Sequence, residues 1–299
     1  MNEPRLRPAL RKTLRRWRIP PVLTRGPEVF EGLAVLDEVP GVALWQALRD
    51  ATLWAEAAPE LRPHLFHRLA EPAWTAPAPE LAAPLAELAV LSRDPGGCDR
   101  AAVAQACGEI AAWADGRGHL ATALAFAQAR ALSAPTDAAA AYEVAQLARR
   151  RAEDARAETW YRRTVAVARQ RGDWATYTRA FLGLGTLHAS RGKITAARRF
   201  HMRAFKAANR NTLRELEGSA LHKLFSLAAD AGHRREALRL ARAALELYGP
   251  AHPRTPRLAH DVARHWLAVG HPSRALAVLR ALLPRATDPA LRLPVLADL

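Results

Sequence analysis

The sequence has little cysteine and no apolar run long enough to cross a membrane. Cys98 and Cys107 are the only cysteines in 299 residues, so a disulfide-stapled fold is excluded and no thiol-based metal site is expected. The apolar runs fall short of the roughly 18 residues that a membrane helix needs. The 16 glycines follow no period, which excludes a collagen-like chain, and the 50% hydrophobic content excludes general disorder.

Proline and alternating patterns are scarce in the middle of the chain. Of the 21 prolines, 13 precede residue 96, and only Pro135 lies between residues 96 and 249. Because proline removes a helical donor and clashes with the preceding turn, this long proline-poor stretch predicts packed helices. No segment alternates with period two for long enough to form a strand. The predicted fold class is therefore all-α.

Lysine is also scarce, with 4 residues against 40 arginines, which together with the alanine content indicates a GC-rich, bacterial source. The net charge of +15 is unevenly spread: +7 over 1–26, −7 over 27–103, +3 over 104–171 and +12 over 172–299. We therefore predict a basic N-terminal arm (1–26), an acidic proline-rich helical cap or degenerate repeats (27–103), and a helical array (104–299).

The arm and the cap carry local patterns of their own. Residues 5–18 would form a basic amphipathic helix, which could bind an anionic membrane, an acidic groove or nucleic acid, or dock on the acidic cap. Within the cap, residues 42–57, 60–70 and 79–92 show helical spacing. Prolines after Trp17 interrupt any signal-peptide core, so we expect no secretory signal and a cytoplasmic protein.

The clearest internal unit places a bulky residue, Leu, Gly and a ring on one helix face, followed by a turn glycine and small residues on a second helix. It consists of Phe181, Leu184, Gly185, His188, Gly192, Ala197 and Ala204. The frame recurs at about 104–137, 138–171, 178–211, 218–251 and 256–289, with turn residues Gly118, Ala152, Gly192, Gly232 and Gly270.

These units resemble the tetratricopeptide repeat (TPR) family over residues of about 104–289. The resemblance implies a right-handed superhelix of about five helix–turn–helix repeats, an N-terminal helical cap and a role in protein–protein interaction. Four positions depart from the pattern. They are Ala152 at a turn, Arg130 and Thr164 where repeats three and four have alanine, and Phe225 in place of a first-helix glycine.

No catalytic constellation is visible in the sequence. It has no glycine-rich phosphate loop, no G-x-S-x-G and no H-E-x-x-H motif. His64 and His67 lack further ligands at a recognisable spacing, and we interpret them as solvated or packing residues. We therefore expect no catalytic residue, no metal, no cofactor and no enzymatic activity.

In the TPR family the first helix of each repeat lines a concave groove. Carried over to this chain, that rule gives a row of ten residues, which we call the predicted groove row: Tyr142, Gln146, Arg149, Arg179, His222, Lys223, Ser226, Arg257, His260 and Arg264. Arginine and lysine in such a groove could clamp the carboxylates of a peptide. The alternative is that these are solvated positions on an idle face.

A second basic cluster lies on the second helix of repeat three. It consists of Lys193, Arg198, Arg199, Arg203, Lys206 and Arg210. It could be an ordinary solvated surface, or it could bind an acidic protein or nucleic acid.

The function predicted from the sequence is a non-enzymatic scaffold or adaptor that binds an acidic protein segment or peptide. The alternative is a nucleic-acid-associated regulatory protein that uses the basic arm and the convex basic cluster. The sequence does not separate a passive adaptor from a peptide-sensing regulator.

Overall fold

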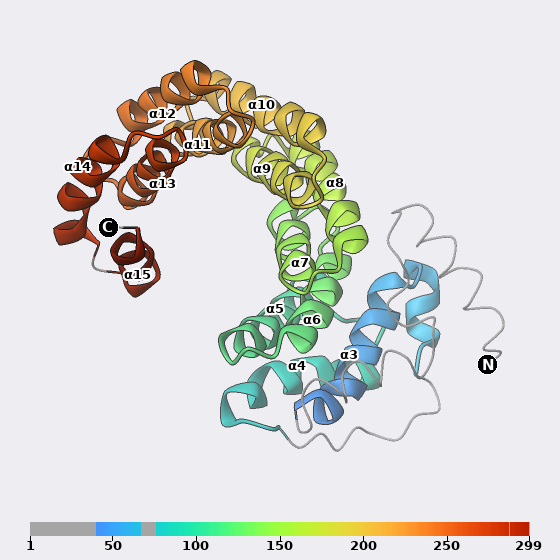
Figure 1. Cartoon of the computed structure of the whole chain (residues 1–299). Coiled ribbons are helices and arrows are strands. Elements are labelled where there is room, and N and C mark those ends of the chain that lie inside the picture. Colours follow the sequence, from blue (N-terminus) through green and yellow to red (C-terminus); the bar gives the residue numbers. More distant parts are fainter. Residues whose placement is uncertain (1–39, 67–75, 287, 299) are drawn as a thin grey trace. The chain divides into compact units, whose positions relative to one another are not determined.

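The computed structural model of the chain describes residues 40–66, 76–286 and 288–298 (Figure 1). The predicted basic arm therefore lies outside the described residues, as does His67. All regular elements within these ranges are helices, which confirms the all-α prediction. They are α3 (Pro40–Glu56), η1 (Pro59–His64), η2 (Pro79–Leu81), α4 (Ala82–Arg93), α5 (Arg100–Gly116), α6 (Leu120–Ser133), α7 (Ala138–Arg150), α8 (Asp154–Arg171), α9 (Trp174–Ser190), α10 (Ile194–Arg210), α11 (Arg214–Asp230), α12 (Arg234–Tyr248), α13 (Thr255–Ala268), α14 (Pro272–Leu282), η3 (Leu283–Arg285) and α15 (Pro289–Ala297).

The chain divides into two compact units between Thr176 and Tyr177. Unit 1 holds α3 to α8, and unit 2 holds α10 to α15 together with most of α9. The predicted boundary between cap and array, at residues 103 and 104, stays a prediction.

Each predicted repeat corresponds to two consecutive helices. The pairs are α5 with α6, α7 with α8, α9 with α10, α11 with α12, and α13 with α14. We call the leading member of each pair a first helix and its partner a second helix. In unit 2 the first helices form one layer and the second helices another (Figure 1).

The five predicted turn residues all adopt the left-handed conformation that reverses the chain between paired helices. Their φ angles are 82° (Gly118), 58° (Ala152), 70° (Gly192), 73° (Gly232) and 76° (Gly270). The residue after each turn donates its N–H to a carbonyl of the last helical turn, as Lys193 does to His188 at 2.9 Å. Among these five residues, only Ala152 holds this conformation with a Cβ, which is sterically unfavourable.

Small residues allow the two helices of a pair to approach closely. On α10, Ala197 and Ala204 are fully buried, and the imidazole of His201 lies against Gly185 of α9. A Cβ on Gly185 would meet His201 Cε1 at 2.3 Å, so no larger residue fits without movement. Burial, with a smaller contribution from Lys223, lowers the pKa of His201 to about 4, so the ring packs as a neutral group.

The N-terminal helices of unit 1 are attached to the array around Trp54 of α3. Its indole N–H donates to the carbonyl of Pro95 at 2.6 Å, and the guanidinium of Arg62 lies 4.4 Å from its ring centre. Arg100 of α5 donates to the carbonyls of Ser133 and Leu132 at the end of α6. Helix α3 also packs on α6 and α4 on α5, and the guanidinium of Arg100 lies 5.9 Å from the Trp54 ring centre. These last contacts join the cap segment to the first helix pair.

Helices occupy two of the three segments expected in the cap. Residues 42–57 correspond to α3 and residues 79–92 to η2 and α4. In the third segment, residues 59–64 form the short 3-10 helix η1 with Pro63 inside it, and residues 67–70 lie outside the described residues. Proline lacks the N–H that a continuing α-helix would need at this position.

Glu56, at the end of α3, is a buried carboxyl group, with 4% of its surface exposed. Its Oε1 accepts no hydrogen bond within the part of the chain that the structure describes. Burial raises the pKa of Glu56 to about 8, so this side chain is protonated at neutral pH.

The pH dependence of stability should report this buried carboxyl. Between pH 4.5 and about 8 the folded state keeps a proton that the unfolded state releases, so the free energy of unfolding should fall as pH rises through this window. The contribution is at most about 1.4 kcal/mol per pH unit. Urea unfolding of Glu56→Gln at several pH values should show a flatter profile than wild type. The same substitution at exposed Glu60 should leave the wild-type slope, and equal slopes in all three proteins would contradict the assignment.

Replacing Gly185 with alanine should destabilise unit 2, because the added methyl group must push His201 or separate α9 from α10. We expect a loss of about 1–3 kcal/mol, as for other overpacked cores. Gly116→Ala is the matched control, since a Cβ there meets no atom within 4 Å. Thermal unfolding should separate the two variants, and a neutral Gly185→Ala would refute the close approach.

Replacing Ala152 with glycine should stabilise the protein by about 1 kcal/mol, because glycine adopts a positive φ without steric cost. Ala166→Gly, at an exposed position inside α8, should instead lose about 1 kcal/mol through backbone entropy. In urea unfolding, the free energy of unfolding should rise in Ala152→Gly and fall in Ala166→Gly. A loss of stability in Ala152→Gly would rule out the strain at this turn.

Candidate partner-binding surface

The predicted groove row is divided between the two units. Tyr142, Gln146 and Arg149 lie on α7 of unit 1. The other seven residues lie on α9, α11 and α13 of unit 2. Each group is therefore described as a local site of its own unit.

In unit 1 the three residues form a hydrogen-bonded cluster with Tyr161 of α8. The Gln146 amide nitrogen donates to the Tyr142 hydroxyl, and the Gln146 oxygen accepts from the Tyr161 hydroxyl at 2.9 Å and from Arg149 at 3.4 Å. Burial, supported by nearby Tyr142, raises the pKa of Tyr161 to about 12. The polar groups of this cluster are thus largely occupied by one another, and sequence reasoning did not assign Tyr161 to it.

In unit 2, residues of α11 and α13 meet at the carboxylate of Asp261. His222 Nε2 lies 2.8 Å from Asp261 Oδ2, and Arg257 Nε lies 3.7 Å from Asp261 Oδ1. Burial by itself would raise the pKa of Asp261, but the hydrogen bond and charge of His222, with Arg257 and His260, lower it overall. Asp261 is therefore a carboxylate held between two first helices.

A second carboxylate comes from the residue that follows α15. Asp298 Oδ2 lies 2.9 Å from Nε2 of buried His260 and 3.9 Å from Nε of Arg264. Leu291 and Val295 of α15 are buried in the same apolar cluster as α13 and α14 residues. The C-terminal helix therefore packs on the last repeat and delivers a carboxylate to the first-helix layer.

Sequence reasoning missed both carboxylates of this site. Arg257 and Asp261 are four residues apart on one helix, a spacing that signals an ion pair. No local pattern connects Asp298 with His260, because 38 residues separate them.

The remaining residues of the predicted groove row in unit 2 are Arg179, Lys223 and Ser226. Arg179 and Lys223 are exposed, and the Ser226 hydroxyl donates to the His222 carbonyl at 3.2 Å.

The six residues of the predicted convex cluster lie on α10 or just before it. All six are exposed, and they are Lys193, Arg198, Arg199, Arg203, Lys206 and Arg210. Of these, Arg198 forms an ion pair at 2.7 Å with Glu236 of α12.

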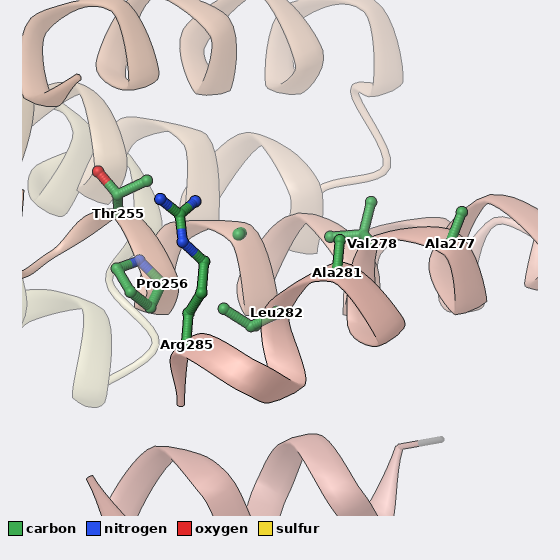
Figure 2. A pocket seen from close by; sticks show the side chains of 8 residues that line it. Thr255, Pro256, Ala277, Val278, Ala281, Leu282 and Arg285 are labelled. Carbon is green, nitrogen blue, oxygen red and sulfur yellow. The ribbon is translucent and has the colours of Figure 1, made fainter. Parts of the chain in front are cut away.

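A cavity of about 340 Å³ lies between α13, α14 and η3 (Figure 2). Its wall is mostly apolar and consists of Thr255, Pro256, Ala259, Ala277, Val278, Ala281, Leu282 and Arg285. The two polar side chains are engaged with the backbone, since Thr255 donates to the Gly249 carbonyl and Arg285 to that of Pro250. The cavity is thus an apolar space within the last repeat.

Within the described ranges, no group of three or more His, Cys, Asp or Glu side chains could hold a metal ion. Both cysteines are free thiols. Cys107 is buried, and burial raises the pKa of its thiol to about 12. None of the described helices is both long enough and apolar enough to cross a bilayer.

Comparison with known proteins finds similar folds but no similar sequences. No protein-family model matches the chain, and no curated protein matches it. Solved TPR proteins are similar to it at low identity. YrrB, a TPR protein with an unusual peptide-binding site, shows 18% identity over 64% of this chain and 90% of its own, with a TM-score of 0.42. TTC0263, a thermophilic TPR protein of Thermus thermophilus, shows 20% identity over 66% of this chain and 98% of its own, with a TM-score of 0.47. The likeness concerns the fold alone.

Proposed function

We propose that the chain is a non-enzymatic scaffold that holds an acidic protein segment on the first-helix layer of unit 2. One observation carries the proposal: the carboxylate of Asp298, the residue that follows the C-terminal helix α15, lies 2.9 Å from His260 Nε2 and 3.9 Å from Arg264 Nε. A carboxylate on a partner segment would meet the exposed guanidinium groups of Arg264 and Arg257. The partner class is therefore a peptide or protein region rich in Asp and Glu.

Arg257 and Arg264 can still donate to such a partner. Arg257 and Arg264 contact their in-chain carboxylates only at 3.7 and 3.9 Å, beyond hydrogen-bond distance, and their side chains are 60% and 66% exposed. Exposed Lys223 lies on the neighbouring first helix. A guanidinium has five N–H donors, so it can accept an external carboxylate while it stays near an internal one.

Recognition on this layer would depend on local geometry rather than on net charge. Helices α11 and α13 together carry four basic residues (Arg214, Lys223, Arg257 and Arg264) and four acidic ones (Glu215, Glu217, Asp230 and Asp261). A partner is therefore selected by where its carboxylates lie, and binding should weaken only moderately with salt.

Charge reversal of Arg257 and Arg264 should reduce binding of Asp/Glu-containing peptides at least tenfold. Two guanidinium groups that donate to carboxylates are then replaced by groups that repel them. The measurement is binding of the full chain to an array of acidic peptides, with charge-neutral Asn/Gln versions beside each. Adding Lys223→Glu should abolish capture.

Arg280→Glu with Arg292→Glu is the matched control, since both arginines are exposed and lie on α14 and α15 outside the proposed site. This variant has the same net charge as the test variant and should retain peptide binding. Equal peptide capture by wild type and by the Arg257/Arg264 variant would disprove the proposal.

A further inference from the structure

The second helices of unit 2 carry a set of exposed cations that the scaffold proposal does not use. We call it the second-helix patch: Arg199, Arg203, Lys206 and Arg210 of α10, and Arg235, Arg239 and Arg242 of α12. None of the seven forms an ion pair with a carboxylate in the described part of the chain. In the first-helix layer, by contrast, Arg257 and Arg264 each lie within 4 Å of an in-chain carboxylate, that of Asp261 or Asp298.

The two rows of the patch lie side by side. The ion pair of Arg198 with Glu236, at 2.7 Å, joins α10 directly to α12, and Figure 1 shows both helices in the same layer. The four α10 residues follow one another at intervals of four, three and four, so they share one face of the helix. At 1.5 Å per residue this row is about 16 Å long.

Charge is segregated between the two layers of unit 2. Helices α10 and α12 contain nine basic residues and two acidic ones, Glu236 and Glu246, and Glu236 is already paired. The first helices α11 and α13 are balanced, with four residues of each sign. More than half of the excess positive charge of this unit therefore lies on α10 and α12, where it faces solvent.

The composition of the patch favours phosphates over a protein partner. Among the large hydrophobic side chains that are exposed in the described chain, Ile194 is the one on these two helices, at the start of α10. Protein interfaces depend on buried aromatic and apolar anchors, which this surface lacks. Arginine, the dominant residue here, matches the geometry of a phosphate group with its planar fork of donors.

The aromatic residues of α10 point to a duplex rather than a single strand. Proteins that bind single strands stack bases on exposed rings. Phe200 is partly buried and packs on His188, with ring centres 5.1 Å apart, and Phe205 packs against the apolar cluster of α11 and α12. We propose that the second-helix patch binds the phosphate backbone of double-stranded nucleic acid without reading its sequence.

The test is fluorescence anisotropy of the full chain with a duplex of about 25 base pairs and arbitrary sequence, from about 50 to 200 mM KCl. The variant Arg199→Gln/Arg203→Gln/Arg239→Gln removes three charges from the patch. Each lost phosphate contact should reduce the slope of log K against log salt by about 0.9, so the slope should fall by about 2.7. Affinity at low salt should fall at least tenfold.

The matched control is Arg93→Gln/Arg169→Gln/Arg171→Gln, which removes three exposed charges from unit 1. It should keep the wild-type salt slope, and an equal loss in both triple variants would overturn the proposal. Competition by polyglutamate as effective as by unlabelled duplex would also overturn it, since the patch would then be a surface for acidic proteins. Arg257→Gln/Arg264→Gln should bind the duplex as wild type does, which separates this test from that of the scaffold function.

Discussion

The close approach of paired helices at small residues is the constraint on which the other features depend. Gly185 leaves room for the ring of His201, and alanines such as Ala197 and Ala237 are fully buried on the second helices. The contact of Gly185 with His201 sets the distance between α9 and α10. Because the pairs repeat, first helices gather in one layer of unit 2 and second helices in the other, so two chemically different surfaces arise from one packing rule.

The two surfaces of unit 2 differ in whether their cations lie beside in-chain carboxylates. On the first-helix layer, Asp261 and Asp298 bind histidine and arginine side chains, so positive charge is local and directional. On the second helices the cations repel one another and face water. The first-helix layer suits a partner whose carboxylates lie at particular positions. The second-helix patch suits a polyanion with regularly spaced charges, such as a nucleic-acid backbone. The scaffold and duplex proposals therefore use separate side chains.

At two positions that depart from the repeat pattern, tertiary packing provides space or a hydrogen-bond partner for the larger or polar side chain. Arg130 stands where repeats three and four have alanine, and Gly108 on the facing helix provides the space, since a Cβ there would lie 3.1 Å from Arg130 Cδ. The guanidinium then pairs with Glu143 at 2.6 Å. Thr164 is fully buried, and its hydroxyl donates to the Trp160 carbonyl of its own helix. In each case a polar atom finds a partner that the spacing alone did not reveal.

Local patterns in the sequence determined the all-α class, the five helix pairs and the turn positions from Gly118 to Gly270, because helix formation and chain reversal depend on residues a few positions apart. They also placed the exposed cations of α10. Only the tertiary structure decided which groups meet across long separations. Asp298 reaches His260, Tyr161 joins Gln146, and Glu236 joins Arg198 because helices pack side by side, and no period in the sequence encodes these contacts. The same packing decided which arginines lie beside an in-chain carboxylate and which do not.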